Sequence, residues 1–361
     1  MKNILVINPG STSTKVSLFQ DEKNAFTESI NHPTEELKHY EHIADQFDFR
    51  KDAVLEWLSS IGFNPSDLQA VVGRGGMLRP IPAGTYEVTK LMKQDCLDGV
   101  GGEHASNLGA LIASSIAEPE HIPAFIVDPV AVDEFPDVAR ISGLKEIPRL
   151  SQLHALNVRA IGIKHAKALN KPFKDCNFVI AHLGGGITVA AIEKGRIMDV
   201  NNANEMGPFS PERTGGLPVW SLAKLIFDGR FKDFNEAKKF MRGHGGLSAY
   251  LGTNDLRVAE QMVDEGNEEA KLIIEAMAYQ IAKEIGASAA VLKGQVEGIL
   301  LTGGVAYDER VTSYIREMTS FIAPVTIYAG EDEMGSLAGG ALRVLRGEEQ
   351  VKNYDKEAKI D

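Results

Sequence analysis

Short apolar runs alternate with longer amphipathic stretches along most of the chain. Two of these runs lead into glycine-rich turns, reading ILVINPGSTST from residue 4 and FVIAHLGGG from residue 178. After each turn the chain continues with β-prone residues, 15–19 and 187–192, and then meets a short polar stop. A P-loop or Rossmann turn leads into a helix instead. The pattern therefore predicts one β-hairpin at each place.

The two hairpins resemble each other residue by residue. Laid over one another without a gap, Asn8 falls on His182 and Gly10 on Gly184. Further along, Val16 falls on Ala190 and Leu18 on Ile192. One such turn in each half of the chain indicates a duplicated domain, with two phosphate-gripping turns that face each other.

The remaining pattern is that of an α/β protein. Helical spacing occurs at 53–61, 107–117, 154–169, 217–227, 258–290 and 334–347, and the polar stretch 31–51 is also compatible with helix. Short apolar runs that read as strands occur at 68–73, 123–128, 177–181, 298–301 and 325–328. This alternation favours parallel pairing beyond the hairpins. The charged tail is expected to be frayed or to lie on the surface.

Composition narrows the class of protein. A chain of 361 residues suits two domains of ordinary size. The net charge of −12 argues against a non-specific nucleic-acid binder, although local Arg and Lys residues can still bind an anion. The cysteines, Cys96 and Cys176, have no disulfide or metal spacing, and no run has the roughly 20 apolar residues of a membrane span. We expect a cytoplasmic protein without a signal peptide.

The first turn carries groups that bind phosphate. Asn8, Ser11, Ser13 and Lys15 offer amide, hydroxyl and ammonium donors. Successive backbone N–H groups in such a turn also form a nest for anions. The alternative is an ordinary hairpin turn whose hydroxyls are solvated.

The second half contains two further glycine turns. Gly184, Gly185 and Gly186 are consecutive, and Gly303 and Gly304 follow another apolar run. Each unneeded glycine costs about 0.5–1 kcal/mol relative to alanine. A close approach of the backbone to a nucleotide explains them better than chance does.

Several longer stretches resemble a known family. They are NPGSTSTK, GRGG at 73–76, DPVAVDEF at 128–135, ISGLKEIPRLSQLHALN at 141–157, EMGPFSPERTGGLP at 205–218 and EDEMGSLAGGALRVL at 331–345. Together they resemble the acetate and sugar kinase, Hsp70 and actin superfamily, and within it the short-chain carboxylate kinases of the acetokinase family. The resemblance implies two ribonuclease H-like (actin-like ATPase) α/β domains with a central cleft. Residues 1–150 with 335–361 would bind the acid, and residues 151–334 would bind the nucleotide.

The resemblance also implies an activity. The family transfers the γ-phosphoryl group of ATP to a carboxylate in the presence of Mg²⁺, giving an acyl phosphate and ADP. The match is closest to the members that phosphorylate butanoate. The implied partners are a short-chain carboxylic acid and ATP or ADP, within a homo-oligomer, with no nucleic acid and no membrane.

Two arginines are the candidate catalytic cations. Arg74 follows a buried strand and would grip the carboxylate with two parallel hydrogen bonds. Arg213 would neutralise the charge that spreads over the transferring phosphoryl group. The alternative for either arginine is a surface salt bridge.

Two acids and a histidine complete the implied site. Asp128 ends a strand and is assigned to the metal or to orientation, because a carboxylate substrate needs no general base. Glu333 corresponds to the acid that the family associates with Mg²⁺, although a carboxylate at a helix N-terminus is also favourable in itself. His182 would donate to the transferring phosphoryl group. His154 aligns with a second family histidine, for which a structural role is expected.

Two positions depart from the acetate kinases. Gly185 replaces an asparagine of the HLGNG turn, and Leu150 replaces a histidine. Both changes make the site less polar and suggest a longer aliphatic substrate. Alternatives remain: a kinase of branched or shorter acids, a sugar kinase, and a nucleotide-operated binding protein of the Hsp70 or actin type.

Overall fold

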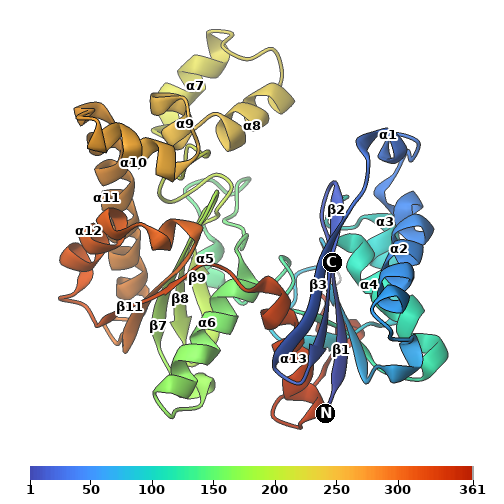
Figure 1. Ribbon diagram of the computed structural model, residues 1–361. Helices are drawn as coiled ribbons and strands as arrows, with labels where there is room; N and C mark the ends of the chain where they lie inside the picture. Colours follow the sequence, from blue (N-terminus) through green and yellow to red (C-terminus); the bar gives the residue numbers. More distant parts are fainter. Residues whose placement is uncertain (360–361) are drawn as a thin grey trace. The chain divides into compact units, whose positions relative to one another are not determined.

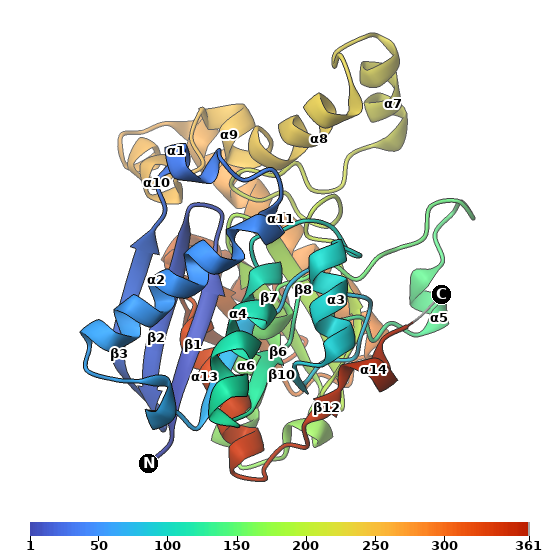
Figure 2. The ribbon, with the colours of Figure 1, turned by 90° about the vertical axis from the view of Figure 1, so that its right-hand side faces the viewer.

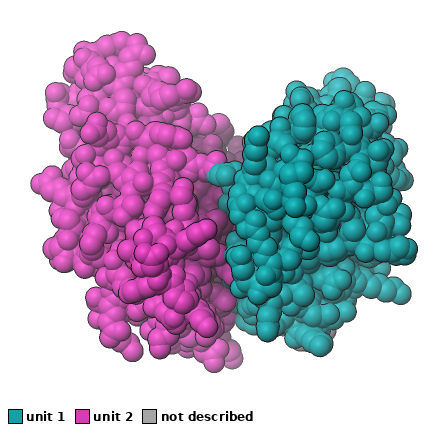
Figure 3. All heavy atoms as spheres, turned by 60° about the horizontal axis from the view of Figure 1, so that its bottom comes forward, with its two compact units in different colours: residues 1–133, 332–361 teal, residues 134–331 magenta. Residues whose placement is uncertain are grey.

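The computed structural model describes residues 1–359 (Figure 1). The chain forms two compact units (Figure 3). Unit 1 contains residues 1–133 and the segment from Asp332 onward, and unit 2 contains Glu134–Glu331. Residues 134–150 therefore belong to unit 2 and residues 332–334 to unit 1. Within residues 1–359, no helix has both the length and the apolar character needed to cross a membrane.

Unit 1 is built on a seven-stranded sheet in the order β12-β5-β6-β4-β1-β2-β3. The strands are β1 (Asn3–Pro9), β2 (Ser13–Gln20), β3 (Lys23–Asn31), β4 (Ala70–Arg74), β5 (Thr85–Glu87), β6 (Ala124–Val127) and β12 (Lys352–Asn353). The first three strands pair antiparallel, as the hairpin pattern predicts, and β1, β4 and β6 are parallel. The carboxyl ends of β1, β4 and β6 therefore meet at one edge of the sheet.

Helices cover both faces of this sheet. They are α1 (Thr34–Leu37), α2 (Phe47–Ser60), α3 (Lys90–Asp98), α4 (Asn107–Ala117), α13 (Glu333–Leu345) and α14 (Tyr354–Glu357), with 3₁₀ turns at Ile43–Gln46, Pro65–Asp67 and Glu118–Glu120. Figures 1 and 2 show α2 and α4 on one face, and Figure 1 shows α13 on the other. Helix α4 approaches β4 so closely that a Cβ on Gly73 would lie 2.1 Å from the carbonyl oxygen of Gly109. The glycines of the GRGG stretch thus serve packing as well as any ligand.

Unit 2 has a five-stranded sheet in the order β11-β10-β7-β8-β9. Its strands are β7 (Phe178–Leu183), β8 (Ile187–Glu193), β9 (Arg196–Val200), β10 (Gly298–Gly303) and β11 (Val325–Ala329). Nearly every residue of β7 and β8 is buried, because helices cover both faces of the sheet. Figure 1 shows α6 on one face and α11 on the other.

The helices of unit 2 are longer and more numerous. They are α5 (Asp137–Arg140), α6 (Ala155–Ala168), α7 (Val219–Phe227), α8 (Phe234–Gly243), α9 (Gly246–Leu251), α10 (Leu256–Asp264), α11 (Glu268–Val291) and α12 (Glu309–Thr319), with 3₁₀ turns at Phe173–Asp175 and Gly304–Tyr307. The single helix predicted over 258–290 is wrong. Gly266 adopts φ +91°, and the Asn267 side chain caps a new helix by accepting from the Ala270 amide.

The two sheets confirm the duplication. The five strands β3-β2-β1-β4-β6 of unit 1 have the same order and directions as β9-β8-β7-β10-β11 of unit 2. The gap-free overlay is wrong beyond the turn, however. Ile7 pairs with Val16, whereas its counterpart Ala181 pairs with Val189 and not with Ala190. The second turn is therefore one residue shorter than the first.

An irregularity of the sheets supports the same correction. In unit 1 the β2–β3 register shifts between Leu18 and Phe19, and in unit 2 the β8–β9 register shifts between Ala191 and Ile192. These bulges coincide only when the shorter turn is allowed for. Leu18 thus corresponds to Ala191 and not to Ile192.

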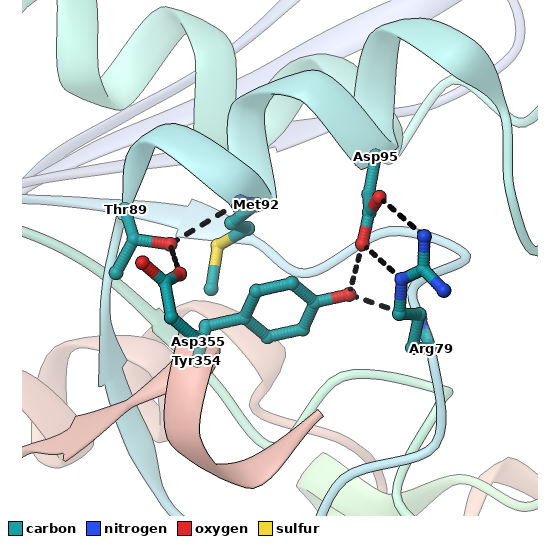
Figure 4. Close-up of polar contacts among 6 residues, drawn as sticks. All are labelled: Arg79, Thr89, Met92, Asp95, Tyr354 and Asp355. Carbon is teal, nitrogen blue, oxygen red and sulfur yellow. Dashed lines mark hydrogen bonds and ion pairs between the residues drawn. The ribbon is translucent and has the colours of Figure 1, made fainter. Parts of the chain in front are cut away.

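The C-terminal segment up to residue 359 is paired and not frayed, and most of its charged residues are exposed, as expected of a tail that lies on the surface. Strand β12 pairs with β5, and Tyr354 is fully buried in the core of unit 1. Its hydroxyl donates to Asp95 at 2.8 Å and accepts from the Arg79 amide at 3.1 Å (Figure 4). Burial raises the pKa of the Tyr354 phenol, so the hydroxyl stays protonated as this network requires.

Removal of the Tyr354 hydroxyl should therefore destabilise unit 1. We expect Tyr354→Phe to lower the free energy of unfolding by about 2 kcal/mol, because the charged and buried Asp95 loses a donor. Chemical denaturation measures the effect, with the exposed Tyr250→Phe as the control. Equal stability of the two variants would show that the network contributes nothing.

Candidate active site

Unit 1 gathers most of its predicted site residues at the carboxyl ends of adjacent strands. Asn8 lies at the end of β1, Arg74 ends β4, and Asp128 follows β6 directly. Arg74 is the register partner of Val127, the residue before Asp128. Ligands in open α/β sheets bind outside these strand ends.

A carboxylate at the start of α13 joins two of these residues. The Arg74 guanidinium forms an ion pair with Oε1 of Glu333, and Nδ2 of Asn8 donates to Oε2 at 2.9 Å. The Arg74 and Glu333 side chains are 18% and 29% exposed. The pair is therefore accessible to a small ligand while each side chain is held in place.

Asp128 is held in an unusual backbone conformation. Its φ of +41° is left-handed, a conformation that non-glycine residues adopt rarely. The carboxylate accepts a hydrogen bond from the Gly84 amide at 2.7 Å, and the Asp128 amide donates to the Gly84 carbonyl at 3.0 Å. Asp128 is 3% exposed, so its carboxylate is fixed before any ligand arrives.

The first phosphate turn is open to solvent on one side. The Gly10 amide closes the turn by donating to the Ser13 carbonyl at 2.7 Å. Ser11 and Thr12 are exposed, and their backbone N–H groups have no hydrogen-bond partner within residues 1–359. Lys15 lies opposite Asn8 in the hairpin and is also exposed. These donors can bind an anion.

A buried arginine, which none of the sequence motifs includes, holds the backbone of this turn. Arg50 lies in α2 on the same face as Val54 and Leu58 and is fully buried. Its guanidinium donates to the carbonyls of Gly10 and Ser11 at 2.8 and 3.0 Å. The available signal in the sequence is a cation inside an apolar helical stripe, which is unusual without a specific partner.

In unit 2 three turns lie together at the strand ends. Gly303 has φ +90°, and a Cβ there would lie 2.3 Å from the carbonyl oxygen of Leu183. Gly303 and Gly330 exchange backbone hydrogen bonds of 3.1 and 2.9 Å. The glycine after it, Gly304, has open space where a Cβ would lie. The glycines therefore allow the turns to pack closely and leave room beside them.

His182 is fixed at the end of β7. It is 2% exposed, its ring stacks on that of His154 with centroids 4.3 Å apart, and its Nε2 lies 3.5 Å from Oε1 of Glu331. Nδ1 of His154 is 2.9 Å from the Thr188 hydroxyl. His154 thus orients the ring of His182, and Glu331 lies where it would stabilise a protonated His182.

Arg213 lies against the HLGGG turn. Its Nη1 donates to the Ala203 carbonyl at 2.8 Å and to the Asn204 amide oxygen at 3.2 Å, and its buried Nε has no partner within residues 1–359. Burial, and then the charge of Arg242, lower the pKa of Arg213. A Cβ on Gly186 would lie 2.4 Å from Nη1. Residue 186 is glycine because the guanidinium needs that space.

Asp128 and Glu333 of unit 1 are the acids that the sequence resemblance assigns to magnesium. Among residues 1–359 there is no group of three His, Cys, Asp or Glu side chains that could hold a metal. Mg²⁺ commonly takes only one or two carboxylates, with phosphate oxygens and water completing its shell. Two carboxylates are enough for such an ion, and both of these are held by neighbouring donors, Asp128 by the Gly84 amide and Glu333 by Asn8.

Comparisons with known proteins identify the family and the fold. Residues 149–321 match the model of the Acetokinase family. The chain is 53% identical over 98% of its length to "Probable butyrate kinase 2" of Caldanaerobacter subterraneus subsp. tengcongensis, all of which is covered. It is 50% identical over 97% of its length to "Butyrate kinase 2" of Clostridium acetobutylicum, 99% of which is covered.

A solved structure shows the same fold. Acetate kinase from Porphyromonas gingivalis superimposes with a TM-score of 0.79 over 96% of this chain and 100% of that one, at 18% identity. Both units thus have the ribonuclease H-like, actin-like ATPase fold that the sequence resemblance implies. The identity to the curated relatives extends over nearly the whole chain, and the protein belongs to the acetokinase family.

Proposed function

We propose that this protein is a butyrate kinase, which reversibly transfers the γ-phosphoryl group of ATP to butanoate and yields butanoyl phosphate and ADP. The relatives at about half identity over the whole chain carry that name. The observation that supports the proposal best is the pair of unlike sites. In unit 1, Arg74 forms an ion pair with the carboxylate of Glu333. In unit 2, Arg213 lies against a glycine turn.

Arg74 is the proposed receptor for the acid. The ion pair with Glu333 uses one guanidinium nitrogen, Nη1. Planar guanidinium groups bind carboxylates with two parallel hydrogen bonds. Butanoate would therefore bind at the accessible side of Arg74, and unit 1 would be the acyl-substrate domain.

Unit 2 is the proposed nucleotide domain. Gly184, Gly185 and Gly186 would admit the phosphates, and Gly303 and Gly304 would admit the nucleoside. Arg213 and His182 would neutralise charge on the transferring group. Asp128 and Glu333 would hold magnesium, which would further neutralise the charge of the phosphates.

The reaction needs no general base. The carboxylate is ionised at neutral pH and attacks the γ-phosphorus directly. The new bond joins a carboxylate oxygen to phosphorus, and the bond to the bridging oxygen of ADP breaks. Asn8, Ser11, Ser13 and Lys15 would hold the phosphoryl oxygens during this exchange.

The proposed site selects the chain length of the acid only weakly. Gly185 and Leu150 make the site less polar than the turn and histidine of acetate kinases, which favours a longer acid. Each additional buried methylene contributes only about 0.8 kcal/mol. Propionate, valerate and branched acids should therefore react as well.

We further propose a cytoplasmic homo-oligomer. Cys96 and Cys176 are buried and unpaired, as in a reducing compartment. In α7, Trp220 and Phe227 are each 90% exposed. Large apolar side chains on one short helix are typical of an interaction surface.

A hydroxylamine assay tests the proposed activity. The protein is incubated with Mg·ATP and straight or branched acids of two to six carbons, and the acyl phosphate is trapped as a hydroxamate. The proposal predicts the largest yield with butanoate. A maximum at isobutyrate or isovalerate would change the substrate. ATP hydrolysis without hydroxamate from any acid would leave the sugar kinase and the nucleotide-operated binding protein.

Arg74→Ala tests the acid site separately. We expect KM for butanoate to rise about a hundredfold, since a bidentate ionic contact of roughly 3 kcal/mol is lost, while KM for ATP stays nearly constant. Initial rates with each substrate varied measure both constants. Arg346→Ala, which removes an exposed ion pair in the same unit, is the control. An unchanged KM for butanoate would remove Arg74 from the acid site.

A further inference from the structure

The side chains of Arg50, Gln46, His32 and Thr14 form a cluster behind the first turn. This cluster contains one charge and no counter-ion. Arg50 is fully buried, yet none of its hydrogen bonds within residues 1–359 goes to a carboxylate. Its Nε and Nη2 donate to the Gln46 amide oxygen at 3.0 and 2.8 Å. Burial lowers the pKa of Arg50 to about 10, so the guanidinium remains charged at neutral pH.

The other members of the cluster are neutral. Burial, and then the charge of Arg50, lower the pKa of His32 to about 4. Its Nε2 lies 2.8 Å from the Thr14 hydroxyl, which also accepts from Nη1 of Arg50 at 3.2 Å. A buried cation without a paired anion is costly, and an apolar side chain of similar size avoids that cost. The charge therefore calls for an explanation beyond packing.

The hydrogen bonds of Arg50 explain why a charge is buried there. The guanidinium holds the carbonyls of Gly10, Ser11 and Ser13 on its own side of the turn, at 2.8, 3.0 and 3.1 Å. In a trans peptide unit the N–H points away from the C=O. The carbonyls of Gly10 and Ser11 share their peptide units with the N–H groups of Ser11 and Thr12. Those two N–H groups are therefore turned to the opposite, open side.

We propose that Arg50 is a positioning residue that makes the turn at residues 10–13 an anion site. It fixes the N–H groups of Ser11 and Thr12 toward the phosphoryl group, and its uncompensated charge raises the potential there. The inference rests on the proposed phosphate role of this turn. The second turn is held differently, because there the buried Ser210 hydroxyl donates to the Gly185 carbonyl at 2.5 Å.

The test measures binding of inorganic phosphate to the full chain by amide resonances in nuclear magnetic resonance spectra. In the wild type, phosphate should shift the N–H signals of Ser11 and Thr12. In Arg50→Met the half-saturating phosphate concentration should rise at least about tenfold, because charge and hydrogen bonds are both lost. Arg50→Lys keeps the charge but loses the fixed, planar set of guanidinium donors. Its phosphate affinity should therefore lie between those of the wild type and Arg50→Met. Arg346→Met is the control.

Kinetics separate positioning from general destabilisation. Arg50→Met should lower kcat about tenfold or more while KM for butanoate remains near the wild-type value, since Arg74 is untouched. Wild-type phosphate affinity and kcat in a folded Arg50→Met would overturn the proposal. So would an equal loss of butanoate and phosphate binding in both Arg50 variants, which indicates a structural role alone. If the wild type makes no acyl phosphate, the proposed function fails, whereas the phosphate titration still tests Arg50.

Discussion

Arg213→Ala should reduce kcat about a thousandfold, because an arginine that neutralises a transferring phosphoryl group contributes 10³ or more to the rate. KM for ATP should change by less than about fivefold, since the proposal assigns nucleotide binding to the backbone of the glycine turns. Arg213 has no carboxylate partner within residues 1–359, and its Nε is buried without an acceptor. Steady-state kinetics with saturating butanoate measure both constants.

Two further variants sharpen this prediction. Arg213→Lys keeps one charge and should recover only part of the lost rate, because lysine cannot present two fixed donors. Arg310→Ala removes an arginine of the same unit that pairs with Glu260, and it should leave kcat unchanged. A wild-type kcat in Arg213→Ala would exclude this residue from the transition state.

Gly186→Ala should have the second largest effect, about a hundredfold in kcat. The new Cβ would lie 2.4 Å from Nη1 of Arg213, a separation that forces the guanidinium to move. A displacement of about 1 Å at a reacting centre is enough for such a loss. The φ of Gly186 is not left-handed, so alanine introduces no backbone strain there. Initial rates and thermal unfolding of the same preparation measure both effects.

Gly143→Ala is a matched control, because a Cβ at that glycine of the same unit meets nothing within 4 Å. The double variant Gly186→Ala with Arg213→Ala should be no slower than Arg213→Ala alone, because both changes act through one guanidinium. Additive losses would show that Gly186 has a separate role. A fully active Gly186→Ala would contradict the described position of Arg213.

Regular patterns predicted much of the fold. The helix at residues 107–117 has the predicted bounds, because most of its residues are apolar or small and Pro119 follows closely. Both hairpins were predicted because β-prone residues continue after the glycine turns. The fold class followed from the family resemblance together with this strand–helix alternation.

The errors have physical reasons. The one-residue difference between the turns is invisible in sequence, since β2 and β8 consist of β-prone residues that fit either register. The tail was expected to be frayed or on the surface because most of its residues are charged; it is largely exposed, but the buried side chain of Tyr354 anchors it. Two helices read as one because Gly266 falls inside a continuous amphipathic pattern.

The site was predicted in part. The sequence motifs identified groups that lie on turns, and within each unit several of them do lie together. Examples are Arg74 with Glu333 in unit 1 and Arg213 with the HLGGG turn in unit 2. Arg50 was missed because its function depends on carbonyl groups, which carry no residue signature. Only three-dimensional contacts show which backbone groups a side chain holds.

Transfer of the γ-phosphoryl group of ATP to a carboxylate oxygen of the acid is the central claim, and oxygen labelling tests it most directly. Butanoate labelled with ¹⁸O in the carboxylate is incubated with Mg·ATP and the protein, and products are followed by ³¹P nuclear magnetic resonance. The account predicts ADP and butanoyl phosphate in equal amounts, with ¹⁸O in the bond between the acyl carbon and phosphorus. Formation of AMP and pyrophosphate, or an acyl phosphate without label at the bridging oxygen, would contradict it.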